Sequence, residues 1–154
     1  MTIERTATSM AILRLLVVSV IVLGGFPSFV DEQDSAAGRQ SAATIDRGKY
    51  IVEGVAVCWR CHSPRDQNGA PDEQRWLLGG PVPIQPSRPT EEWADVAPRL
   101  AGLPPGTDEQ FITLLTTGIS RTGRPPRPPM PQFRLTRSDA EAVLAYLKSI
   151  KPTE

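Results

Sequence analysis

The sequence predicts an all-α domain in which three main helices are joined by long proline-rich loops. Three stretches of the 154-residue chain carry helix signals, at about 46–57, 107–118 and 136–151. No stretch of useful length alternates apolar and polar residues as a half-buried strand does. Most of the 16 prolines lie between the three stretches, where they leave little room for further helix.

The first expected helix runs from about 46 to 57, with Asp46 in the position of an N-cap. Its apolar contacts would come from Tyr50, Ile51, Val55 and Val57. Gly48 and Gly54 each weaken the helix by roughly 1 kcal/mol relative to alanine. Because glycine has no side chain, these positions would also let another helix cross closely.

The other two helices have clearer boundaries. Thr107 and Gln110 have the spacing of a capping box, and Gly118 is a natural C-terminal stop. Thr136 is the expected N-cap of the last helix, and Pro152 ends it. Apolar residues recur at helical spacing along this last helix, at Val143, Leu144, Leu147 and Ile150.

The most specific motif in the chain is Cys58-Trp59-Arg60-Cys61-His62. The chain has two cysteines and one histidine, and all three lie in this motif. A C-x-x-C-H pattern is typical of the covalent attachment of a c-type haem. On one helical turn, both thiols can reach the two vinyl groups of one porphyrin, and the adjacent imidazole can reach its iron.

Other interpretations of the cysteine pair fit less well. The pair could form a small disulfide or a thioredoxin-like redox site, but the latter is expected beside a βαβ unit, which the sequence does not show. A structural zinc site needs four nitrogen or sulfur ligands, usually in two separated pairs, and the motif offers three adjacent ones. The sequence therefore favours haem.

Residues 1–37 are expected to form a signal peptide or an N-terminal membrane anchor, and residues 38–154 a single domain. Residues 15–26 carry no charge. This uncharged run has the length typical of a signal peptide and is shorter than the ~20 apolar residues of a spanning helix. An uncleaved anchor would associate with the membrane through residues 15–30. In either case we expect the domain outside the cytoplasm, periplasmic or exported. If the N-terminal segment is not cleaved, it would anchor the domain to the inner membrane.

The long stretch 63–106 is expected to be mostly loop. A loop of this length is unusual in a compact domain, but a loop that closes over a cofactor can draw its packing from that cofactor. We expect its apolar residues to anchor it rather than to act directly; these are Trp76, Leu77, Leu78 and Trp93.

Met130 is the candidate for a second iron ligand. Met1 and Met10 lie in the N-terminal segment, so Met130 is the only methionine of the expected domain. Pro129 and Pro131 restrict the backbone on both sides and remove competing N–H donors. A thioether is a soft, neutral ligand that favours ferrous haem. The alternative is a methionine that fills a gap in a loop core.

With these features, the sequence resembles the class I c-type cytochromes, and within them the branch of single-haem proteins and cytochrome subunits of dehydrogenases. The resemblance covers about 47–150. It rests on Gly48-Lys49-Tyr50, Cys58 to His62 with Ser63-Pro64-Arg65, Pro98-Arg99-Leu100-Ala101-Gly102, and Met130-Pro131 with Phe133, Leu135 and Thr136 leading into Tyr146-Leu147. It implies a cytochrome c-like domain of three main helices around one covalently bound haem c. The first and last helices would cross near Gly48 or Gly54 and Tyr146.

For the site, the resemblance implies thioether bonds at Cys58 and Cys61, with His62 as the proximal iron ligand and Met130 as the distal one. The carbonyl of Pro98 would accept a hydrogen bond from the other ring nitrogen of His62, which fixes the tautomer and raises the basicity of the ring. His62 and Pro98 lie farther apart here than in the shorter members of the family.

The implied function is transfer of one electron at a time between periplasmic or membrane redox partners, such as a dehydrogenase or a terminal oxidase. The chain would not be an enzyme, although it would suit the electron-transfer subunit of a dehydrogenase. If Met130 does not bind iron, the open position would suit a haem sensor or a small haem enzyme, but the sequence has no distal histidine.

The charges bear on these partners. The chain has 17 basic and 17 acidic residues, and with no basic motif it gives no sign of nucleic-acid binding. Between Gln110 and Ser138 every charged residue is an arginine: Arg121, Arg124, Arg127, Arg134 and Arg137. We expect either that this arginine patch docks an acidic redox partner, or that one or two of its members neutralise haem propionates.

Overall fold

The computed structural model describes residues 30–88 and 92–152, with the backbone alone in 30–36. The chain divides into two compact units, Met1–Ala37 and Gly38–Glu154. The expected signal peptide or membrane anchor therefore lies almost entirely outside the described residues. Among the residues that are described, no helix is both long and apolar enough to span a membrane.

The first main helix begins earlier than expected. Helix α2 covers Val30–Lys49 and continues into a π-helical segment, η1, at Tyr50–Val55. Asp46 lies inside α2, so its prediction as the N-cap is wrong. The helix extends upstream because the preceding residues include alanines, which are the best helix formers. In addition, Thr44 satisfies its hydroxyl within the helix by donating to the carbonyl of Gln40 at 2.8 Å.

A single turn, α3, follows at Trp59–His62. Val57 separates this turn from η1 and has a φ of 45°, which is unusual for a β-branched residue. Two short strands, β1 at Gly80–Pro81 and β2 at Val96–Ala97, pair antiparallel. The sequence predicted no strand, because strands of two residues leave no alternating pattern to detect.

Helix α4 lies between its predicted N-cap, Thr107, and its predicted stop, Gly118. It covers Asp108–Thr117, and its capping box is present: Gln110 donates its N–H to Thr107 Oγ1 (3.3 Å), and Thr107 donates its N–H to Gln110 Oε1 (3.1 Å). Gly118 follows with a φ of 67°. This left-handed conformation favours glycine and ends the helix.

Helix α5 covers Arg137–Ser149 and begins after its predicted N-cap, Thr136. It crosses the end of α2 at Gly48, which lies directly against Ala142 and Tyr146. The expected crossing is therefore confirmed at Gly48. The other candidate, Gly54, meets only the ring of Tyr50 on its own helix.

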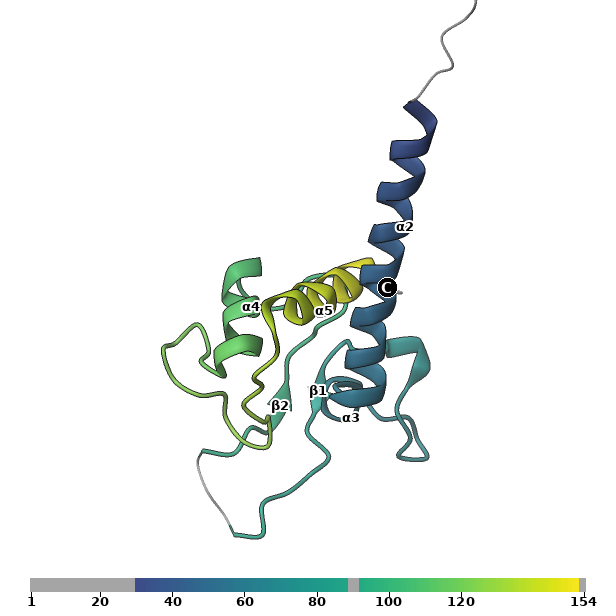
Figure 1. Ribbon diagram of the computed structural model, residues 1–154. Helices are drawn as coiled ribbons and strands as arrows, with labels where there is room; N and C mark the ends of the chain where they lie inside the picture. Colours follow the sequence, from purple (N-terminus) through teal and green to yellow (C-terminus); the bar gives the residue numbers. More distant parts are fainter. Residues whose placement is uncertain (1–29, 89–91, 153–154) are drawn as a thin grey trace, which may run out of the picture. The chain divides into compact units, whose positions relative to one another are not determined.

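The core of the second unit lies where these helices meet the loops. Helix α4 packs against α5, as Figure 1 shows. Helix α5 also contacts η1. The apolar residues with no exposed surface come from η1, the long loop and α5: Val52, Leu77, Ala101, Ala140 and Leu147. The prediction of an all-α domain with three main helices is confirmed.

In its described part, the stretch 63–106 has little regular structure beyond the two strands and a 3-10 turn, η2, at Glu73–Arg75. Three of its four expected anchors pack in or against the core: Trp76, Leu77 and Leu78. Trp93 has a more local role, since its indole N–H donates to the carbonyl of Ile84 at 2.9 Å within the same loop.

Candidate functional site

Helix α3 carries Cys61 and His62 on one turn, and Cys58 is its N-cap residue. Cys58 precedes the turn, and its carbonyl accepts the N–H groups of Cys61 (3.3 Å) and His62 (2.9 Å). Both cysteines are half-buried free thiols. Two thiols on one turn beside an imidazole are the arrangement that covalent haem attachment requires.

The His62 ring is held in one orientation. The residue is 7% exposed, and its Nδ1 lies 2.8 Å from the carbonyl oxygen of Pro98. Because a carbonyl oxygen only accepts, Nδ1 must carry the proton, and Nε2 of the neutral ring then has a free lone pair. Among the described residues, the Pro98 contact is the one hydrogen bond of the His62 side chain. Burial lowers the pKa of His62 although the Pro98 carbonyl opposes this, and this direction favours the neutral ring that binds iron.

The environment of Cys58 also fits a thioether. Burial raises the pKa of this thiol to about 11, and the neighbouring Cys61 contributes in the same direction. A thiolate would be costly here because the one favourable contact, a backbone hydrogen bond, does not offset the burial of its charge. A thioether carries no charge, so the same surroundings do not oppose it. The donor set therefore fits a covalently attached haem.

The short β-ladder explains how residues 36 positions apart in the sequence meet. Strand β1 contacts α3, and β1 pairs with β2 through Gly80 opposite Ala97. Pro98 directly follows β2, so the ladder places its carbonyl beside the His62 ring. The hydrogen bond that the family resemblance implied is present despite the long separation.

Met130 lies on a different segment, between α4 and α5. It is half-buried in a turn in which its N–H donates to the carbonyl of Arg127 at 3.2 Å. In the described part of the chain it is not among the side chains that pack against the core, which disfavours a role as core filler. The hydrogen bonds that join His62 to Pro98 do not extend to Met130, so its role as an iron ligand stays a prediction.

Part of the arginine patch is engaged within the protein. Arg137 pairs with Glu109 (2.8 Å) and Glu141 (2.9 Å), and the Glu109 carboxylate raises the pKa of Arg137 most. Arg127 donates its Nε to the carbonyl of Glu92 at 3.1 Å. These contacts reduce the number of arginines that a partner or a propionate could use.

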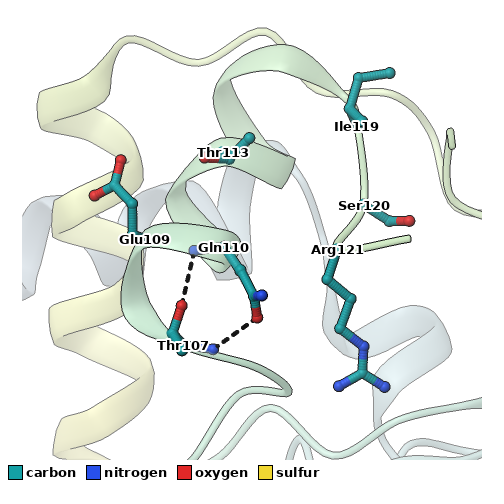
Figure 2. A pocket seen from close by; sticks show the side chains of 7 residues that line it. All are labelled: Thr107, Glu109, Gln110, Thr113, Ile119, Ser120 and Arg121. Carbon is teal, nitrogen blue, oxygen red and sulfur yellow. Dashed lines mark hydrogen bonds between the residues drawn. The ribbon is translucent and has the colours of Figure 1, made fainter. Parts of the chain in front are cut away.

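Arg121 is placed differently. It lines a pocket beside the N-terminal turn of α4, together with Thr107 and Gln110, whose polar groups are used in the capping box (Figure 2). No lining residue of this pocket belongs to the C-x-x-C-H turn. Both roles suggested for the arginine patch stay predictions.

Sequence reasoning missed two residues beside the histidine. Ser63 has no exposed surface, and its hydroxyl accepts the N–H of Leu77 at 2.9 Å. A Cβ atom on Gly79 would lie 2.8 Å from the carbonyl carbon of Pro98, so only glycine fits there. The available signal was the Gly79-Gly80 pair directly after an apolar run, which indicates a close approach of two backbones.

The class of protein follows from the match of residues 45–151 to the Cytochrome c family. This match covers more than half of the chain, and the chain belongs to the cytochrome c family. It is a c-type cytochrome, and membership of this family implies covalently bound haem c. The predicted cytochrome c fold is confirmed.

Three relatives refine this placement. The chain is 31% identical over 142 residues to a diheme cytochrome c-type protein of Cereibacter sphaeroides, covering 86% of this chain and 42% of the relative. It is 28% identical over 141 residues to a nicotinate dehydrogenase subunit of Pseudomonas putida, a match that covers 85% of this chain and 11% of the relative. It is 26% identical over 115 residues to the fructose dehydrogenase cytochrome subunit of Gluconobacter japonicus, a match that covers 68% of this chain and 22% of the relative. The chain thus spans less than half the length of each relative, and it is related to cytochrome subunits of dehydrogenases.

Proposed function

We propose that this protein carries one electron at a time on a single haem c, attached through Cys58 and Cys61 and ligated by His62 and Met130. The haem supplies the ferrous–ferric couple. The protein supplies two thiols on one turn and a neutral imidazole with a free Nε2. The single observation that carries the proposal is the 2.8 Å contact between His62 Nδ1 and the Pro98 carbonyl, because it leaves the lone pair of the other ring nitrogen available for a bond to iron.

The proposal of a single haem is supported by the residue counts. The sequence has two cysteines and one histidine, which provide one pair of thioether bonds and one imidazole ligand. A second haem attached in the same way would need another C-x-x-C-H motif. The diheme relative is more than twice as long as the part that this chain matches.

The proposal of Met130 as the second ligand is supported by its chemistry and its position. It is the one methionine in residues 38–154, its side chain is half-buried, and it does not pack against the described core. A second protein ligand would leave no iron position for an external molecule. Such a centre suits electron transfer because little has to rearrange when the iron changes its charge.

The redox partners are proposed from the names of the relatives, and the cellular location is proposed from the N-terminal sequence. Two relatives are named as dehydrogenase subunits, which favours a dehydrogenase as the electron donor; a terminal oxidase would then be a suitable acceptor. The uncharged residues 15–26 favour export to the periplasm. There the segment 1–37 would be cleaved as a signal peptide or would hold the domain at the inner membrane through residues 15–30.

Visible spectra of the oxidised and reduced protein test the proposal, recorded before and after acid–organic extraction of free haem. We expect haem that resists extraction and a low-spin spectrum with methionine–iron character. A high-spin spectrum that shifts with carbon monoxide or cyanide would contradict ligation by Met130 and would indicate a sensor or a small haem enzyme. Protein without haem from a strain that matures c-type cytochromes would contradict the whole proposal.

A further inference from the structure

Three short segments meet around the His62 ring and hold one another through main-chain hydrogen bonds. They are 62–63, 77–79 and 98–101. The N–H of Gly79 donates to the carbonyl of His62 (2.7 Å), and the carbonyl of Leu77 accepts the N–H groups of Leu100 (2.9 Å) and Ala101 (3.1 Å). The middle segment therefore ties the segment of the histidine to the segment of Pro98.

Ser63 adds a side chain to this set of bonds. It has no exposed surface, and its Oγ accepts the N–H of Leu77 at 2.9 Å. Leu77 is also fully buried and has a φ of 56°. This conformation is uncommon for a residue other than glycine and persists only where the surrounding structure fixes it. Here both polar groups of the Leu77 backbone are fixed, the N–H by Ser63 and the carbonyl by the segment that follows Pro98.

The turn at 77–79 is in direct contact with the peptide that holds the histidine. A Cβ atom on Gly79 would lie 2.7 Å from the carbonyl oxygen of Ala97 and 2.8 Å from the carbonyl carbon of Pro98. The two backbones therefore touch without an intervening side chain. A displacement of this turn would move the Pro98 carbonyl relative to Nδ1 of His62.

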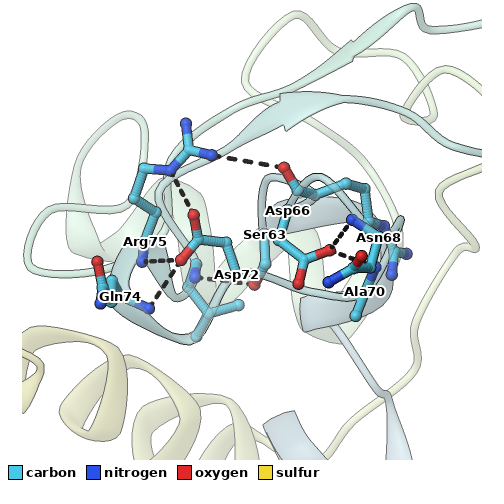
Figure 3. Close-up of polar contacts among 9 residues, drawn as sticks. Ser63, Asp66, Asn68, Ala70, Asp72, Gln74 and Arg75 are labelled. Carbon is cyan, nitrogen blue, oxygen red and sulfur yellow. Dashed lines mark hydrogen bonds and ion pairs between the residues drawn. The ribbon is translucent and has the colours of Figure 1, made fainter.

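The loop between Ser63 and this turn is folded by its own side chains, as Figure 3 shows. Asp66 accepts two N–H groups of the loop through Oδ1 (2.8 and 2.9 Å). Asp72 accepts the N–H groups of Gln74 (2.9 Å) and Arg75 (3.2 Å), and its other oxygen binds the Arg75 guanidinium at 2.7 Å. Local bonds thus shape the loop, whereas the Ser63 bond attaches its end to the histidine segment.

We propose that Ser63 is a positioning residue for the axial histidine. Its hydroxyl group fixes the Leu77 turn, and this turn holds the Pro98 carbonyl against Nδ1 of His62. The inference rests on the proposed function, since it takes His62 as the iron ligand. A weaker bond at Nδ1 makes the imidazole a poorer electron donor to iron and so disfavours the ferric state. Loss of the hydroxyl is therefore expected to raise the reduction potential.

The sharpest test is a matched pair of variants in the haem-loaded protein, Ser63→Thr and Ser63→Val. Ser63 has an extended backbone (φ −110°, ψ 137°) that accepts β-branched residues, and the two replacements have the same shape and differ in the hydroxyl. We expect a higher reduction potential in Ser63→Val than in Ser63→Thr. We also expect the Nδ1–H of His62 to exchange with solvent roughly tenfold faster in Ser63→Val, as measured by NMR.

Ser149→Ala is the control variant. It removes a serine hydroxyl that donates to the carbonyl of Tyr146 at 2.7 Å in α5, and it should leave both the potential and the Nδ1–H exchange rate unchanged. Equal potentials and equal exchange rates in the Ser63 pair would overturn the inference.

The wild-type protein provides a second measurement if neither Ser63 variant takes up haem. The amide of Leu77 and the Nδ1–H of His62 must then both be protected from exchange, and rapid exchange of the Leu77 amide would overturn the inference. A wild-type spectrum without histidine–iron ligation is a distinct result, because it would overturn the proposed function and not only the role of Ser63.

Discussion

Gly48 lies directly against the backbone of Ala142 where α2 crosses α5. A Cβ atom on Gly48 would be 1.9 Å from the carbonyl oxygen of Ala142 and 2.8 Å from the Cβ atom of Tyr146. Since helices approach this closely only where a side chain is missing, the glycine sets the distance between them. The segment η1 follows α2, and the carbonyl of its residue Val52 accepts the N–H of Cys58 at 2.9 Å. The crossing of α2 and α5 therefore helps to position the segment that precedes the C-x-x-C-H turn.

Gly48→Ala is expected to destabilise the domain by about 1–3 kcal/mol, the usual cost of forcing extra atoms into a packed interface. Gly54→Ala is the matched control: its Cβ atom would meet only the Tyr50 ring, at an ordinary 3.6 Å. That control should be neutral or stabilising by up to about 1 kcal/mol because alanine favours helix. Urea unfolding of both variants measures the difference, and equal stabilities would contradict the role of the crossing.

Met130→Leu is expected to keep the fold and lose the second iron ligand, since leucine has a similar volume and no sulfur. The variant should bind added cyanide or carbon monoxide, which the wild-type protein should resist. Met130→His should restore a low-spin spectrum at a lower reduction potential, because histidine stabilises ferric iron relative to methionine. An unchanged low-spin spectrum in Met130→Leu would show that another group binds the iron.

The contact between α2 and α5 should weaken in acid. Arg47 donates to both oxygens of Asp139, at 2.8 and 3.2 Å, and this guanidinium holds the pKa of Asp139 below its usual value. A carboxyl whose pKa is lower in the folded state stabilises the fold above about pH 4, and the stabilisation is lost as the pH falls through the folded pKa. The free energy of unfolding should therefore differ between wild type and Asp139→Asn at pH 7, and this difference should shrink by pH 3. A difference that does not depend on pH would exclude this pair as its source.

The sequence was sufficient where a structural feature depends on neighbouring residues. Thr107 with Gln110, and Thr136 before the last helix, are local caps, and both helices begin where those caps predict. The start of α2 was missed because Asp46 has the chemistry of a cap without the position of one. Between Val30 and Asp46 no residue stops the helix, and a capping side chain alone cannot do so.

The surroundings of the histidine were only partly predictable. The C-x-x-C-H turn is contiguous in the sequence, and its hydrogen bond to Pro98 was expected through the resemblance to a family. The bond from Ser63 to Leu77 has no sequence signature, since it joins two loop residues that follow no periodic pattern. Leu77 was expected to be an apolar anchor, and it is one, but its backbone carries the further hydrogen bonds.

Peptide mass spectrometry of the denatured holoprotein tests the central claim most directly. Trypsin cleaves after Arg60, between the two motif cysteines, and so separates peptides 50–60 and 61–65. If Cys58 and Cys61 both hold one haem c, the two peptides will stay joined and will carry the mass of one haem per chain. Two separate peptides with free thiols, or haem on only one of them, would contradict the account.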